Sequence, residues 1–188
     1  GVLCDSLRSE SRLNAVGRFA ARDDTVRMAR NHLRIARQLR ERPEILDTEW
    51  PPPVFIIGLP RTGTTFLHQL MSQDPRHRTI PYWESFDPVP PASGPDPRAG
   101  NVEKMLRQLE GMAPDYHAIH PMSATGAEEC VALFMNELRT LQFDFQYRVP
   151  GYSKWLLSQD ARIAYSAYQR QLRMIQFFRP AGSRFILK

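Results

Sequence analysis

The sequence predicts an α/β fold of three layers, in which a central parallel sheet is flanked by helices. Apolar segments at 54–57 and 185–187 have the composition of buried parallel strands. The segment 80–84 is predicted as a further short strand or extended segment, and stretches of helical periodicity separate the three. Because the last apolar segment ends at Lys188, we expect the chain to be the truncated, N-terminal part of a longer fold.

Residues 54–65 carry the strongest signal in the chain. Gly58, four further residues, Gly63 and two threonines have the spacing of a phosphate-binding loop. In such loops, backbone N–H groups and a helix N-terminus converge on an anion. Loops that hydrolyse ATP or GTP carry lysine before the last Ser/Thr, whereas here Thr64 takes that place and Arg61 carries the positive charge. The loop is predicted to bind a phosphate in a protein other than an ordinary ATPase or GTPase.

The run Ile-Gly-Leu-Pro-Arg-Thr-Gly-Thr-Thr at 57–65, with Phe-Leu-His-Gln-Leu after it, carries a family resemblance. It resembles the 5′-phosphosulfate loop of sulfotransferases that use 3′-phosphoadenosine 5′-phosphosulfate (PAPS). The variant is similar to the bacterial sulfotransferase-like family related to the tyrosylprotein sulfotransferases. The resemblance covers about residues 53–188 and implies the N-terminal part of a P-loop sulfotransferase-like domain at 51–188. The first fifty residues are only loosely similar, and residues 1–50 are expected to form a separate helical segment.

The resemblance also implies an activity, the transfer of a sulfuryl group from PAPS to a hydroxyl of a small-molecule acceptor. Lys188 resembles the strand-end lysine that supports the leaving group in the family. The family binds the 3′-phosphate of the cofactor with an arginine and a serine on a segment after this position. The residues expected to hold the 5′-phosphate are Pro60, Arg61, Thr62, Gly63, Thr64 and Thr65.

Glu84 is the first candidate for the base that takes the acceptor's proton. In the tyrosylprotein-type enzymes this role belongs to a glutamate after the first helix. Glu84 ends the segment 80–84, and strand ends beside a phosphate loop are where α/β sites assemble. The carboxylate could instead be a surface group or a partner of Arg76 or Arg78.

His120 is the rival candidate, because a histidine is the base in the cytosolic sulfotransferases. His117 and His120 lie three residues apart without a third ligand nearby, so we expect an acceptor pocket or a surface there, and no metal site.

The capping-box pattern of 125–128 predicts the start of the next helix. A further long helix is expected from Ser153 to about residue 178.

The N-terminal segment is expected to contain one helix between residues 13 and 42, either continuous or broken near Asp23 and Asp24. Beside its apolar positions runs a stripe of arginines, formed by Arg27, Arg30, Arg34 and Arg37. The stripe could meet an acidic partner or a polyanion, although a solvated helix surface is the commoner explanation.

Composition sets limits on function. The formal net charge of +5 suits a polyanionic cofactor, but it would also suit nucleic acid or a membrane surface. No apolar run approaches the length of a spanning helix, so we expect a soluble, cytoplasmic protein that acts on a small hydroxylated molecule and not on nucleic acid. Two alternatives stay open: a P-loop kinase or NTPase, and a non-catalytic nucleotide-binding or interaction protein.

Overall fold

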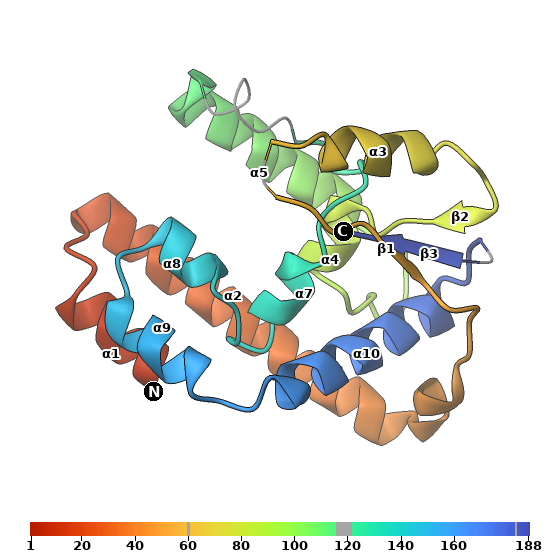
Figure 1. Ribbon diagram of the computed structural model, residues 1–188, viewed down its shortest axis with the longest axis horizontal. Coiled ribbons are helices and arrows are strands. Elements are labelled where there is room, and N and C mark those ends of the chain that lie inside the picture. The colour runs from red at the N-terminus through yellow and green to blue at the C-terminus, as the bar shows by residue number, and fades with distance from the viewer. Residues whose placement is uncertain (60, 116–121, 183) are drawn as a thin grey trace. The chain divides into compact units, whose positions relative to one another are not determined.

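The computed structural model describes residues 1–59, 61–115, 122–182 and 184–188 (Figure 1). The chain forms two compact units: unit 1 consists of Gly1–Glu41 and Val131–Gln171, and unit 2 of Arg42–Cys130 and Leu172–Lys188. Among the described helices, none has both the length and the apolar composition that crossing a bilayer requires. The elements are α1 (Val2–Ser9), α2 (Ala15–Glu41), the 3-10 helix η1 (Pro43–Asp47), β1 (Val54–Phe55), α3 (Thr64–Met71), β2 (His77–Arg78), α4 (Tyr82–Phe86), α5 (Arg98–Met112), α7 (Val131–Met135), α8 (Gln142–Gln146), α9 (Pro150–Leu157), α10 (Ala161–Phe178) and β3 (Arg184–Leu187).

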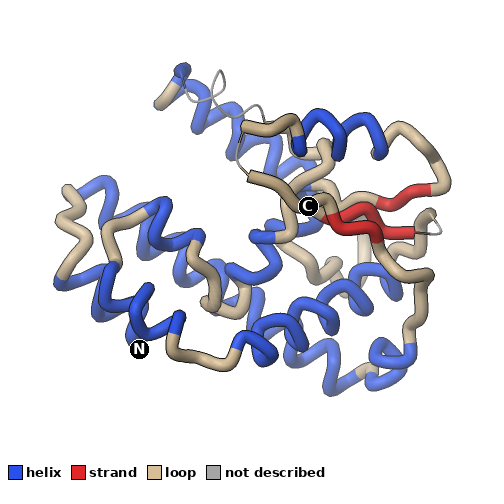
Figure 2. The backbone as a smooth tube through the Cα atoms, viewed as in Figure 1, coloured by secondary structure: helices blue, strands red, loops and turns tan. Residues whose placement is uncertain are grey.

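Unit 2 is built on a parallel sheet of three strands in the order β1-β3-β2 (Figure 2). Val54 pairs with Ile186, and His77 pairs with Arg184. β3 lies between β1 and β2 in the described sheet, and its residues Phe185, Ile186 and Leu187 are buried. In Figure 1, α3 and the last turns of α10 lie on opposite sides of these strands. The predicted α/β fold with a parallel sheet between helices is confirmed.

β1 differs from the strand predicted at 54–57. It has two residues instead of four, and Phe55 and Ile57 are 54% and 90% exposed. The prediction of a central strand buried on both faces is wrong for this chain. Among the described residues β1 pairs with β3 alone, so it is an edge strand of the described sheet and not a central one.

The short strand or extended segment predicted at 80–84 is wrong from Tyr82 onward, because residues 82–84 lie in helix α4; Pro81 is extended and forms a bridge with Ala127. Pro81 has no N–H to give to a sheet, and its carbonyl accepts the N–H groups of Glu84 and Ser85 as the first turn of the helix forms. The strand of this region, β2, comes earlier, at His77–Arg78.

Two helix predictions need similar corrections. The capping-box segment 125–128 opens no helix, because Ala127 forms an antiparallel bridge with Pro81 and helix α7 begins only at Val131. The helix expected from Ser153 to 178 is two helices, α9 and α10, separated by residues 158–160. By contrast, the single helix expected between 13 and 42 is confirmed as α2, which is unbroken.

Unit 1 is helical and has a core of its own. The side-chain amides of three buried residues, Asn31, Asn136 and Gln171, are linked by hydrogen bonds in this order. The amide of Gln171 then donates to the carbonyl of Leu133. Buried polar groups that satisfy one another in this way fix how their helices pack. The apolar core around α1, α2, α8 and α9 consists of Leu3, Met28, Phe143, Val149 and Tyr152.

Candidate active site

The glycines of the phosphate-binding loop are required by its shape. Gly63 is the N-cap of α3 and has φ 88°, a left-handed conformation that favours glycine. A Cβ atom on Gly58 would lie 2.7 Å from the Cγ2 atom of Thr64, so a side chain there would push the loop apart. The N–H of Leu67 donates to the carbonyl of Gly63 and starts the helix. The loop therefore turns directly from β1 into the N-terminus of α3, as anion binding requires.

Arg61 occupies the loop in a left-handed backbone conformation, with φ 67°. For a residue other than glycine this conformation is strained, and such strain is concentrated at functional sites. Arg61 is one of the residues that line a cleft of about 830 Å³, together with residues 56–59 and 63–66, Glu129 and Lys188. The predicted phosphate-binding residues Arg61, Gly63, Thr64 and Thr65 thus share one cleft.

Lys188 enters this cleft from the end of β3. Its ammonium group donates to the hydroxyl oxygen of Thr65 at 2.6 Å and to the Oε1 atom of Glu129 at 2.6 Å. The N–H of Cys130 donates to the carbonyl of Lys188 at 2.8 Å, which fixes the backbone beside Glu129. The predicted lysine therefore lies beside the loop. A carboxylate, that of Glu129, binds this lysine and lines the same cleft.

The sequence alone does not indicate a role for Glu129. Its partner Lys188 is 59 residues away along the chain, so no local spacing connects them. The sequence around Glu129 indicates only weakly that it belongs to a site. It shows a pair of acidic residues, Glu128 and Glu129, directly before Cys130, which is buried. Acidic residues beside a buried segment occur at many surfaces, and only the fold shows that this one faces the loop.

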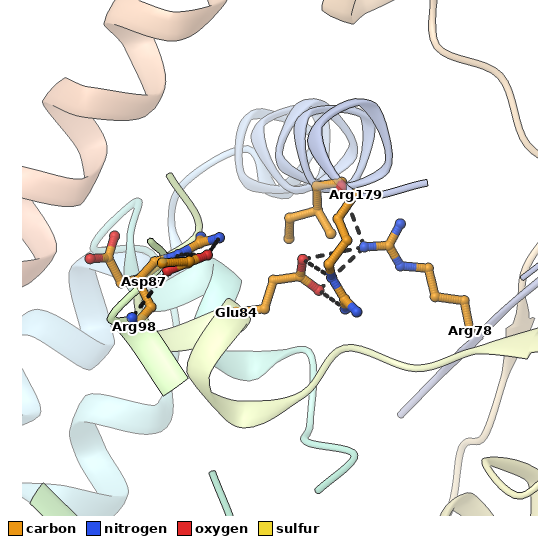
Figure 3. A network of polar contacts seen from close by, with 7 residues as sticks. Arg78, Glu84, Asp87, Arg98 and Arg179 are labelled. Atoms are coloured by element: carbon orange, nitrogen blue, oxygen red, sulfur yellow. Dashed lines mark hydrogen bonds and ion pairs between the residues drawn. The ribbon is translucent and has the colours of Figure 1, made fainter. Parts of the chain in front are cut away.

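Glu84 lies elsewhere in unit 2, on α4, and only 2% of its surface is exposed (Figure 3). Both of its oxygens accept from Arg179, at 2.9 and 2.7 Å, and both accept from Arg78, at 3.3 Å. Burial lowers the pKa of Arg78, while the hydrogen bond to Glu84 raises the pKa of Arg179. Glu84 does not line the cleft of the loop. The sequence suggests Arg76 or Arg78 as a possible partner of Glu84, and the structure shows the ion pair with Arg78.

The same region holds a second polar cluster around Trp83, the residue next to Glu84. Arg98 lies over the indole ring at 4.6 Å from its centroid, and Arg179 lies over it at 5.3 Å. Arg98 also donates to the carbonyl of Asp87 at 2.8 Å (Figure 3). Cations on an aromatic face add stability when they are partly desolvated. These contacts join α4 to α5 and to the end of α10, which is a structural role.

His68 attaches the phosphate-binding helix to the sheet. It is buried on α3, and its Nε2 atom forms a hydrogen bond of 3.2 Å with the carbonyl of Ile186 in β3. Burial lowers the pKa of His68, and the charge of Lys188 adds to this effect. The neutral ring is therefore the form that the folded protein favours.

This preference predicts a pH dependence of stability. Because the pKa is lowered on folding, the unfolded chain binds more protons below the ordinary histidine pKa of about 6.5, and the free energy of unfolding falls as the pH falls from there through the folded value. Urea unfolding at about pH 7.5 and about pH 5.5 checks this. His68→Gln, which can still donate to Ile186, should lose less stability between these pH values than the wild type. Equal losses would contradict the assignment.

Three predicted site residues, Pro60, His117 and His120, lie outside the described residues. Within the described ranges, no three histidine, cysteine, aspartate or glutamate side chains gather as a possible metal site.

Known proteins resemble the chain in sequence and in structure. The chain superimposes on the sulfotransferase STF1 from Mycobacterium tuberculosis H37Rv with 31% identity and a TM-score of 0.75, over 100% of this chain and 52% of that one. For the sulfotransferase STF9 from Mycobacterium avium, the identity is 26%, the TM-score is 0.83, and the coverage is 99% and 49%. The chain thus spans about half the length of these proteins.

No curated protein matches the chain. The model of the sulfotransferase family, however, matches residues 52–178, which include the loop, Glu84 and Glu129. The chain belongs to the sulfotransferase family.

Proposed function

We propose that the protein transfers a sulfuryl group from PAPS to a hydroxyl of a small-molecule acceptor. The observation that carries this proposal is the cleft in which the phosphate-binding loop, Arg61, Lys188 and Glu129 meet. Such a transfer needs a held phosphate, a cation at the leaving oxygen and a base for the acceptor. The cleft offers a group for each, and membership of the sulfotransferase family supports the assignment.

The loop would hold the 5′-phosphate of the donor. N–H groups at the start of α3 and the hydroxyls of Thr64 and Thr65 can donate to its oxygens, and the helix dipole favours the negative charge. The Arg61 guanidinium can add a forked, charge-assisted contact. Lys188 would stabilise the bridging oxygen as the S–O bond breaks, since it already lies at the hydroxyl of Thr65.

Glu129 is the base that the geometry favours. The acceptor hydroxyl would give its proton to this carboxylate while its oxygen attacks sulfur and adenosine 3′,5′-bisphosphate leaves. The ion pair with Lys188 is compatible with this role, because a bound phosphate would draw the lysine away and release the carboxylate. Glu84 suits the role less well, because Arg78 and Arg179 already occupy both of its oxygens. The role of His120 stays a prediction.

The direct test measures the transfer of labelled sulfuryl groups from PAPS to a panel of hydroxylated acceptors by the full-length gene product. Phosphoryl transfer from ATP is measured in parallel. Sulfuryl transfer without phosphoryl transfer is the expected result. Phosphoryl transfer, or a failure to bind adenosine bisphosphate, would refute the proposal and favour a kinase or a non-catalytic protein.

Arg61→Ala is expected to weaken the binding of adenosine bisphosphate at least about tenfold, because a charge-assisted contact is worth about 1.5–3 kcal/mol. It should also slow the transfer, because the contact strengthens as the leaving phosphate gains charge. Arg61→Lys should restore only part of the affinity, since a point charge cannot reproduce the fork. Calorimetry measures the affinity. Arg76→Ala is the matched control, because Arg76 is exposed and pairs with Asp74 outside the cleft; equal effects of the two alanine variants would refute the role of Arg61.

A further inference from the structure

Helix α2 of unit 1 exposes a set of apolar side chains that its own core does not use. Its buried face consists of Ala21, Met28, Asn31 and Ile35. On the other side, four large apolar residues are each more than half exposed, and we call them the apolar stripe: Val16, Phe19, Val26 and Leu33. At 100° per residue they fall within an arc of about 100°. Single exposed apolar residues need no explanation, but Phe19, Val26 and Leu33 follow one another at seven-residue steps and so lie in line along one side of the helix, as residues of an interaction surface do.

The same face of α2 is basic. Arg22, Arg30, Arg37 and Arg40 are exposed and project within the angular range of the stripe or directly beside it. Two acidic residues share this side of the helix with the four arginines: Asp23, and Glu41, which pairs with Arg37 at 2.7 Å. Helices that lie on an anionic membrane surface combine apolar side chains with arginine and lysine, and on α2 Arg22 and Arg40 flank the apolar stripe while Arg30 and Arg37 lie within its arc.

A pocket of about 510 Å³ adjoins this face, and residues of α1 and α2 line it. Its lining includes three arginines, Arg8, Arg18 and Arg22, and we call this pocket the arginine pocket. Leu7, Leu13 and Val26 supply apolar lining. Because Val26 belongs to both the pocket and the apolar stripe, the two surfaces are continuous. The volume is in the range of small-molecule sites, and the lining suits a molecule with an anionic head and an apolar tail.

We propose that the arginine pocket and the apolar stripe together form a peripheral membrane site, which takes an anionic phospholipid. The arginines bind the phosphate of the head group, and the stripe enters the boundary between head groups and acyl chains. Nucleic acid would satisfy the arginines but not the stripe, because interfaces with nucleic acid are polar. The site lies wholly in unit 1 and is independent of the cleft in unit 2, so it adds a function that the sulfotransferase activity does not imply.

Sedimentation of the whole chain with lipid vesicles tests the proposal. Binding is expected to vesicles that contain phosphatidylglycerol, to be weaker with pure phosphatidylcholine, and to fall as salt is raised. The variant R8Q/R18Q/R22Q should bind about a hundredfold less, because each arginine near a charged membrane contributes about 1 kcal/mol. The control R76Q/R107Q/R162Q removes the same charge from exposed arginines elsewhere and should bind as the wild type does. Equal losses in both triple variants would overturn the proposal.

Insertion of the stripe has its own readout. Phe19→Trp replaces an exposed side chain, so the fold is kept, and its added fluorescence should shift to the blue and be quenched by brominated lipid. Phe19→Ser with Leu33→Ser should weaken binding while the charge stays constant. If soluble glycerol phosphate displaces the protein from vesicles at low concentration, the pocket binds free phosphates and the membrane site is refuted. Binding to single-stranded RNA but not to vesicles would refute it equally.

Discussion

Glu84→Gln is expected to lower the free energy of unfolding by about 3–5 kcal/mol, the usual cost of removing one partner of a buried ion pair. Arg78 has an exposed side-chain fraction of 2%, and it would keep its charge in the interior without a carboxylate beside it. Arg179 would keep one acceptor, the amide oxygen, but would lose the second and the negative charge of both. Urea unfolding followed by circular dichroism measures the effect, which amounts to a large part of the stability of an ordinary domain.

The control is Glu103→Gln, which removes an exposed carboxylate that pairs with Arg107 at 2.9 Å. An exposed pair of this kind contributes at most about 1 kcal/mol. Adding Arg78→Met to Glu84→Gln should recover part of the loss, because the unpaired buried charge is then removed too. A Glu84→Gln protein with wild-type stability and turnover reduced a hundredfold would show the reverse, that Glu84 is the base.

Glu129→Gln is expected to lower turnover by the factor that a general base usually supplies, about 10² to 10⁴. The affinity for adenosine bisphosphate should be kept or become tighter, because the carboxylate no longer competes with the phosphate for Lys188. Kinetics of sulfuryl transfer and calorimetry, both on the full-length gene product, separate the two effects.

Glu44→Gln serves as the control for Glu129, since it changes an exposed carboxylate of η1 in the same unit. Loss of bisphosphate binding in Glu129→Gln would mean that the residue only shapes the loop. Turnover near that of the wild type would return the role of base to His120.

The loop and its flanking elements could be predicted because their determinants are local. The glycine spacing, the apolar strand before it and the helix after it all lie within residues 54–71, and the structure places them in this order. Glu129 could not be predicted in the same way, because its position depends on the pairing of residues 130 and 188 across the fold. Contacts of this kind leave no periodicity in a single sequence.

Glu84 shows how a tertiary contact overrides a local pattern. The run Ile-Pro-Tyr-Trp before it has strand-like composition, yet helix α4 begins at Tyr82 directly after Pro81, and Arg78 and Arg179 bind Glu84 on this helix. Pro81 itself pairs with Ala127, so the capping-box segment is held in an extended pairing where the sequence predicts a helix. No local pattern indicates this long-range pairing.

One edge of β1 pairs with no strand of the described part of the chain, and this bears on how the chain behaves at high concentration. Backbone groups at an exposed edge can pair with a strand of another molecule, and apolar side chains beside the edge strengthen such pairing. Phe55 and Ile57 supply these side chains, and Phe66 and Leu70 on α3 are exposed as well. Light scattering that grows with protein concentration, and that falls when Ile57 is replaced by lysine, would identify β1 as the origin of aggregation.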